Sequence, residues 1–75
     1  MDRNQNIAYF LSFCIEEYKK HLHTSGSEAM QRMKNAGVMS YLTNHYEVLH
    51  TQSVQWLMED IDEFIRLHQD THTGL

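Results

Sequence analysis

VQWLMEDIDEFIRLHQ, residues 54–69, is the stretch whose spacing decides the fold. Its apolar side chains recur every three or four residues, which is the period of an amphipathic α-helix. They are Val54, Leu57, Met58, Ile61, Phe64 and Ile65. Ser53 comes just before the stretch and can cap its first turn. The spacing predicts a helix over residues 54–69 that buries one face and leaves its charged face in water.

Working back toward the N-terminus, the same period predicts two helices at the start of the chain. An apolar stripe indicates a helix over residues 4–23, and small polar residues then favour a turn. Ser25 and Glu28 have the capping-box spacing, which predicts a second helix over residues 26–36. The stripe consists of Ile7, Phe10, Leu11, Cys14, Ile15, Tyr18 and Leu22, and the inward residues of the second helix are Ala29, Met30, Met33 and Ala36.

A third helix is predicted over residues 39–49, between Gly37, a left-handed cap, and the final helix. Its apolar face comprises Val38, Tyr41, Leu42, His45, Val48 and Leu49. Residues 70–75 lack this pattern and are expected to fray. No stretch alternates like a strand, so the sequence predicts one all-α domain over residues 1–75, a small four-helix domain with short connections.

Charge is distributed unevenly along the 75 residues. Residues 1–37 carry five basic and four acidic side chains, whereas residues 38–75 carry one basic and six acidic ones. An acidic C-terminal half is unsuited to binding a phosphate backbone and suits a basic protein partner or simple solubility. The apolar run near the N-terminus is too short to span a bilayer, so no membrane partner is expected.

Cys14 is the single cysteine, and it falls in the middle of the first apolar stripe. A lone thiol cannot form an internal disulfide and fits a reducing cytoplasm, where we expect the protein to reside. Burial also makes a thiol unreactive. The sequence has no phosphate-binding loop and no nucleophile elbow, so no catalytic residue, no cofactor and no enzymatic activity are expected.

Two of the predicted helices carry aromatic residues on the side away from their core stripe. Tyr9 and Phe13 are opposite the stripe of the first helix, and Trp56 is opposite that of the last, with Asp60 and Glu63. Large aromatic side chains on a charged face are typical anchors of protein contacts, and acids around them suit a basic-rimmed partner. These five residues are the predicted partner-binding surface, and self-association into a homodimer would use the same surface. The alternative is that the fold wraps the first helix on both sides and buries Tyr9 and Phe13.

Tyr46, His50 and Thr51 mark the junction between the third and fourth predicted helices. We expect Tyr46 to pack inward and His50, with Thr51, to satisfy backbone groups where one helix ends and the next begins. His45 lies on the predicted apolar face, where an imidazole needs hydrogen-bond partners. A structural role for these histidines is favoured over a catalytic one, since a histidine near a helix C-terminus is stabilised by the helix dipole.

Other site types receive weaker support from the sequence. His68 with His72, or Glu17 with His21, have a metal-ligand spacing, but structural zinc needs four defined ligands and no metal site is predicted. The acidic residues from 59 to 63 favour a solvated face over paired catalytic carboxylates. A small helix-turn-helix DNA-binding regulator, turning at Gly37, is the alternative function. Its recognition helix would contain neither Lys nor Arg, so no nucleic-acid partner is expected.

Three segments resemble a family of short bacterial proteins of unknown function. They are FCIEEYK at residues 13–19, YEVLHT at residues 46–51 and EDI at residues 59–61. The likeness extends from about Ile7 to Ile65, and Glu47 stands where the family more usually has Asp. Members are often encoded beside a larger protein resembling ADP-ribosyltransferase toxins. The resemblance therefore implies an accessory or antitoxin-like role with a toxin-like neighbour as partner, and it implies no catalytic residue.

Overall fold

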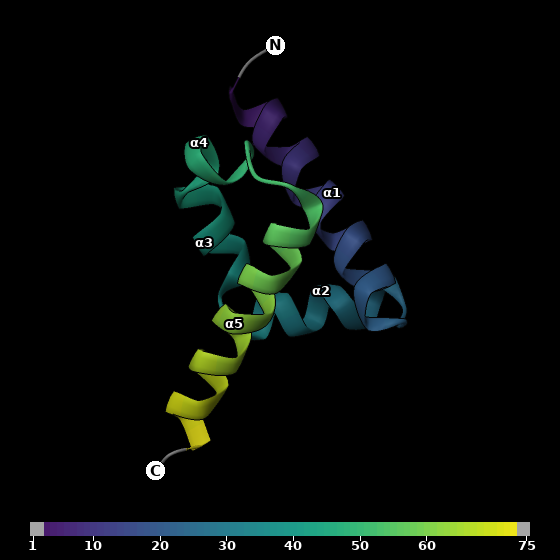
Figure 1. Ribbon diagram of the computed structural model, residues 1–75, viewed down its shortest axis with the longest axis vertical. Helices are drawn as coiled ribbons and strands as arrows, with labels where there is room; N and C mark the ends of the chain where they lie inside the picture. The colour runs from purple at the N-terminus through teal and green to yellow at the C-terminus, as the bar shows by residue number, and fades with distance from the viewer. Residues whose placement is uncertain (1–2, 74–75) are drawn as a thin grey trace.

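The computed structural model describes the backbone of residues 3–73 and the side chains of residues 3–68. This part of the chain is helical throughout, apart from short turns, and contains no strand, which confirms the all-α prediction (Figure 1). The helices are α1 (Arg3–Leu22), α2 (Gly26–Asn35), α3 (Val38–Asn44), α4 (Tyr46–Leu49) and α5 (Val54–Thr73).

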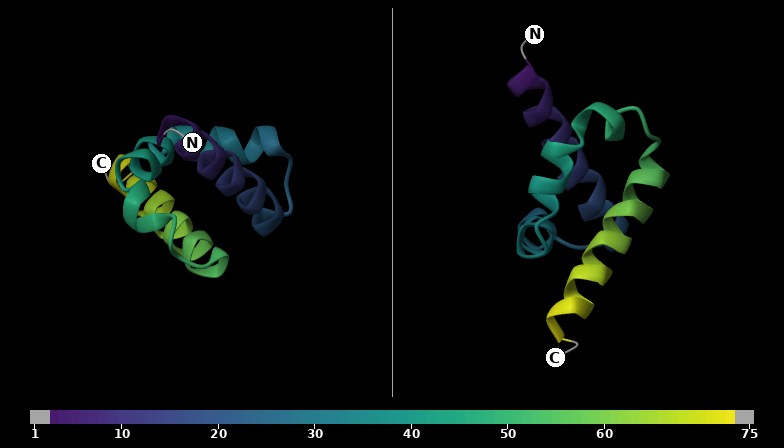
Figure 2. Two further views of the ribbon diagram at one scale, coloured as in Figure 1. Left: turned by 90° about the horizontal axis from the view of Figure 1, so that it is seen from above. Right: turned by 90° about the vertical axis from the view of Figure 1, so that its left-hand side faces the viewer.

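The two long helices, α1 and α5, frame the molecule. The N-terminal end of α1 and the C-terminal end of α5 project at opposite ends of the long axis (Figures 1 and 2). Helix α2 crosses near the C-terminal end of α1, and α3 and α4 return along the other side to the start of α5. The shape is elongated, with principal extents of 44 × 24 × 20 Å.

Serine caps and one glycine set the helix boundaries as the sequence predicts. The backbone N–H of Glu28 donates to Oγ of Ser25, and that of Trp56 donates to Oγ of Ser53, each at 3.1 Å. These hydroxyls satisfy donors that the first turn of a helix leaves without partners. Gly37 has φ of 79°, the left-handed conformation that glycine adopts without a steric penalty.

The prediction of one helix over residues 39–49 is wrong, because the chain bends at His45. With φ of −114° and ψ of 22°, His45 ends α3 and begins α4. The bend preserves both helical hydrogen bonds of His45, because the N–H of His45 donates to the carbonyl of Tyr41 and the carbonyl of His45 accepts from the N–H of Leu49. It leaves His45 and Val48 exposed, although both were expected on the apolar face.

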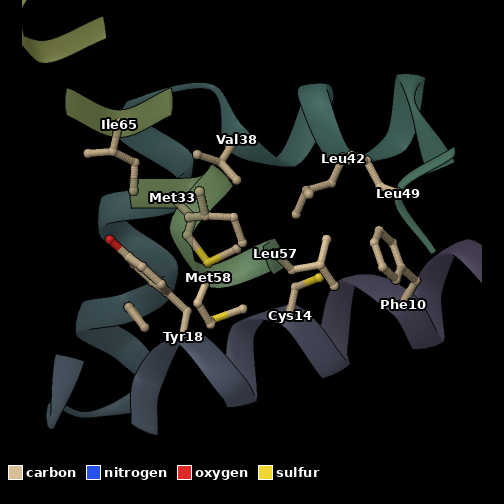
Figure 3. Close-up of a cluster of buried hydrophobic side chains, with 12 residues drawn as sticks. Phe10, Cys14, Tyr18, Met33, Val38, Leu42, Leu49, Leu57, Met58 and Ile65 are labelled. Carbon is tan, nitrogen blue, oxygen red and sulfur yellow. The ribbon is translucent and has the colours of Figure 1, made fainter. Parts of the chain in front are cut away.

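The core fills the space enclosed by all five helices (Figure 3). Its central residues have 0% exposure, including Cys14 on α1, Met33 on α2, Leu42 on α3 and Ile61 on α5. The other core residues are Phe10, Tyr18, Ala29, Val38, Leu49, Leu57, Met58 and Ile65. Burial raises the pKa of the Cys14 thiol to about 12, so this thiol remains protonated and unreactive at neutral pH.

Two further expectations need correction. Met30 and Val54 were assigned to the core but are 47% and 40% exposed, because each lies at the edge of a stripe that neighbouring helices cover only in part. Helix α5 continues to Thr73, past the predicted end at residue 69, since each added helical residue gains a backbone hydrogen bond even without an apolar face. Of the tail expected to fray, residues 74–75 lie outside the described residues.

Candidate partner-binding surface

Tyr9 and Phe13 form an exposed ring pair on the outer face of α1. Tyr9 is 67% exposed and Phe13 is 41% exposed, while Phe10 and Cys14, their neighbours in the chain, are in the core. A spacing of four residues places the two rings on one side of the helix. The alternative in which the fold buries both rings is therefore not what the structure shows.

The ring pair continues toward the C-terminus of α1 as a charged strip. Glu16 pairs with Lys19 at 2.8 Å, and Glu17 pairs with Lys20 at 3.5 Å. The hydrogen bond and the positive charge from Lys19 lower the pKa of Glu16 below its usual value. Glu16 is therefore ionised and carries its charge within one turn of Phe13.

A hollow of about 590 Å³ lies between α1 and the first turns of α5. Its apolar floor comes from Met58 and Val54. Its other lining residues are polar or charged: Glu17, Lys20, His21, Gln55 and Glu59. Glu17 is one turn beyond Phe13 on α1, so the hollow begins where the ring pair ends.

A hydrogen-bonded cluster joins α1 to α5 beside this hollow. The hydroxyl of Tyr18 donates to Oδ1 of Asp62 at 3.0 Å, and Nε2 of His21 donates to Oδ2 at 2.6 Å. Burial and the carboxylate of Asp62 raise the pKa of Tyr18 to about 12. The sequence analysis missed this cluster, because its members are more than forty residues apart and nothing local links them.

Trp56 is exposed, as its helical phase predicts, but it lies on another side of the molecule. It is 41% exposed and shares its side of α5 with Asp60, one turn later. The carboxylate of Asp60 accepts from the hydroxyl of Tyr41 on α3 at 2.6 Å, whereas Gln55 and Glu59 line the hollow toward α1. Trp56 therefore belongs to the α3 side of α5, and no ring contact joins it to Tyr9 or Phe13 among the described residues.

The two acids expected beside Trp56 already have intramolecular partners. Asp60 is half-buried, and Glu63 pairs with Arg66. Burial and the Asp60 carboxylate raise the pKa of Tyr41 to about 12, because ionising the phenol would place two negative charges together. The structure thus separates the expected single surface into two exposed aromatic positions, Tyr9 and Phe13 on α1 and Trp56 on α5.

Tyr46, His50 and Thr51 meet at the end of α4. The ring of Tyr46 packs edge-on against Phe10 at 5.4 Å and stacks on His50 at 4.5 Å. Nδ1 of His50 donates to the carbonyl of Tyr46, and Oγ1 of Thr51 donates to the carbonyl of Val48, each at 2.8 Å. Each carbonyl also accepts a backbone N–H, that of His50 for Tyr46 and that of Thr51 for Val48, so the two side chains supply second donors at the helix end. His50 is exposed, so the junction is a surface cap.

Aromatic stacking extends along α3 and α5 in a way that the sequence analysis did not anticipate. Tyr41 stacks on Phe64 with ring centroids 4.4 Å apart, and Phe64 stacks on His68 at 3.9 Å. His45 tilts against Tyr41 from the other end at 5.2 Å. The spacing of four residues within each helix was a usable signal, whereas the contact between the helices was not.

Metal and nucleic-acid sites find no support in the described residues. Among residues 3–68, no group of three His, Cys, Asp or Glu side chains is placed to hold a metal ion. The side chain of His72 lies outside the described residues, and His21 is engaged by Asp62. The helix that would read DNA, α3, has only seven residues and carries no cation. None of the described helices is both long and apolar enough to span a bilayer.

The described residues form a small all-α domain that exposes aromatic side chains outside its core. The family model described as "Protein of unknown function (DUF3791)" matches residues 9–68. The chain belongs to this family, which confirms the expected likeness to a family of unknown function. Searches of the curated proteins and of the solved structures gave no match.

Proposed function

We propose that the protein is a non-enzymatic protein-interaction module whose binding surface is the α1 ring pair, Tyr9 and Phe13. The observation that carries this proposal is their exposure, 67% and 41%, on a helix whose opposite face supplies the core. Exposed rings contribute less to folding than buried ones do. Aromatic side chains of this kind supply much of the binding energy when a partner covers them.

The chemistry of the described residues supports a binding role over an enzymatic one. The cluster of Tyr18, His21 and Asp62 is the constellation closest to an acid–base site. It lacks an activated nucleophile, because the Cys14 thiol is buried and protonated. Asp62 is already bonded through both oxygens, which suits a clasp between two helices. A free, buried cysteine is also compatible with the proposed cytoplasmic location.

The resemblance described above supports a specific version of this role. It implies an accessory or antitoxin-like protein whose partner is encoded beside it and resembles an ADP-ribosyltransferase toxin. We therefore take the product of the neighbouring gene as the first partner to test. Self-association into a homodimer is the competing use of the same rings. DNA binding finds no favouring observation, because α3 carries no cation.

Hydroxyl-radical labelling of the purified chain, with and without the neighbouring gene product, tests the proposal. Tyr9 and Phe13 should be labelled strongly in the free chain and protected in the complex, while labelling of Trp56 stays the same. Equal labelling of Tyr9 and Phe13 in both samples, despite complex formation, would show that the binding surface lies elsewhere. Protection of the rings in the free chain at high concentration would instead identify a homodimer.

A further inference from the structure

We propose that the α1 ring pair and the adjoining hollow together form a groove for one basic amphipathic helix of a partner protein. This inference rests on the proposed function and specifies the chemistry of the partner. The hollow is lined by Glu17, Lys20 and His21 on α1 and by the first turns of α5. Phe13 lies one turn before Glu17 on α1, and Tyr9, one turn earlier still, borders a separate shallow hollow on the same helix.

The dimensions of the groove fit a short helix. From Tyr9 to Lys20 this face of α1 comprises twelve residues, a rise of about 16 Å or three helical turns. A helix that lies in a groove presents apolar anchors at i, i+3 or i+4, and i+7. Val54 and Met58 supply the apolar lining of the hollow, and Phe13 lies one turn before it on α1. Three turns of an incoming helix therefore have apolar contacts along their length.

A second copy of this chain fits the surface less well. A buried aromatic side chain covers about 150–250 Å², so rings exposed by 67% and 41% offer on the order of 200 Å² together. A stable interface needs about 800 Å² from each partner. Two flat α1 faces would bury little beyond the rings. A helix in the groove instead contacts the rings, the floor and both walls.

The charge of the groove selects a basic helix. Oε2 of Glu59 on the α5 wall accepts from the neutral amide of Gln55 at 3.4 Å and has no cation beside it among the described residues. Asp62, behind His21, is held by a phenol and an imidazole. Lys20 on the α1 wall is already paired with Glu17. The acids in and beside the groove therefore outnumber the lysine, and lysines or arginines flanking an apolar stripe would complement them.

Nuclear magnetic resonance of the isotope-labelled full chain tests this assignment. The probe is a synthetic peptide of about 14 residues with leucines at i, i+3, i+4 and i+7 and lysines on its other face. Two control peptides have the same composition with scrambled leucine spacing, or glutamates in place of the lysines. We expect only the first peptide to shift amide resonances of residues 13–21 and 54–59, with binding that weakens as salt rises.

Two charge-reversal variants make the test specific for the groove. Glu59→Lys should weaken binding of the basic peptide by about tenfold or more. Glu63→Lys changes net charge equally one turn farther along α5, outside the residues that line the hollow, and should change binding by less than about threefold. The proposal is overturned if the basic peptide shifts no resonance, if the scrambled peptide binds equally, if the shifts are confined to the Trp56 indole and residue 60 and spare residues 13–21, or if both variants weaken binding alike.

The outcome can be separated from that of the proposed function. If the basic peptide does not bind while the neighbouring gene product still protects Tyr9 and Phe13 from radical labelling, the proposal of a basic helix is wrong and the proposed interaction surface is retained. If neither the peptide nor the neighbouring gene product covers the rings, both proposals fail.

Discussion

Phe13 and Cys14 are consecutive in the chain, yet Phe13 is exposed at the surface of α1 and Cys14 is buried in the core. The Cys14 side chain is completely buried among the helices, whereas Phe13 is 41% exposed. The rotation of 100° per residue in an α-helix, together with the neighbours that cover only one side, produces this difference. Helix α1 therefore has one face that packs in the core and another that is exposed, and the binding role proposed for the exposed face can be tested separately from folding.

Replacing Tyr18 by Phe should lower the free energy of unfolding by about 1–2 kcal/mol. The substitution removes a hydrogen bond to a carboxylate that joins α1 to α5 while keeping the buried ring. Tyr9→Phe is the matched control, because the side chain of Tyr9 is exposed and its loss of a hydroxyl should change stability little. Urea unfolding of both variants measures the difference. Equal midpoints for the Tyr18 variant and wild type would show that the clasp to Asp62 contributes nothing.

Stability should fall at high pH as Tyr18 and Tyr41 ionise. Both have a pKa of about 12 in the folded protein, above the ordinary value of 10.0 that applies when the chain is unfolded. A pKa that is higher in the folded state favours folding below pH 10, and this contribution is lost as pH rises toward 12. Unfolding curves across this range should show the decline, and replacing both tyrosines by Phe should flatten it. An equally steep decline in the double variant would contradict the assignment.

His50→Ala should destabilise the protein by only about 0.5–1 kcal/mol. The imidazole donates to the carbonyl of Tyr46, but that carbonyl also accepts the backbone N–H of residue 50, which the variant keeps, and the exposed site lets water replace the lost donor. A larger loss, of the kind that follows from leaving a buried group without a partner, is not expected. Thermal unfolding measures the change. If the variant melts like wild type yet loses its partner, then His50 serves binding and the capping role is wrong.

The protein should not bind duplex DNA appreciably, even at low salt. Helix α3 carries no Lys or Arg, and residues 38–75 carry six acidic side chains against one basic one. Binding to DNA depends on cations that displace counterions from phosphates. Fluorescence anisotropy with a random duplex in about 50 mM salt measures this. Micromolar affinity that falls steeply as salt increases would contradict the prediction.

Local signals account for the parts of the fold that the sequence predicted. The hydroxyls of Ser25 and Ser53, the left-handed Gly37 and the apolar period of residues 54–65 each act within one or two turns, so they can be recognised without the structure. The bend at His45 could not be recognised in this way. An uninterrupted helical period through residues 39–49 fits the sequence equally well, and the bend is seen only in the tertiary structure, where Tyr46 packs against Phe10 of α1.

The exposure of the candidate site residues could be predicted from local signals, whereas their arrangement in space could not. Helical phase alone places Tyr9, Phe13 and Trp56 outside the core, and all three are exposed. Whether rings from two helices share one surface depends on how those helices are rotated against each other. Contacts such as Tyr41 with Asp60 decide that rotation, and they are specified by the tertiary structure.

The central claim, that the ring pair on α1 binds a partner and is dispensable for folding, is tested most directly by a comparison of variants. Tyr9→Ala/Phe13→Ala is compared with Trp56→Ala and wild type, in each case for thermal unfolding of the isolated chain and for capture of the co-expressed neighbouring gene product. The account predicts that the double variant unfolds within about 0.5 kcal/mol of wild type, as substitutions at exposed positions do, and no longer captures the partner, while Trp56→Ala retains capture. A double variant that fails to fold, or that folds and still captures the partner as wild type does, would contradict it.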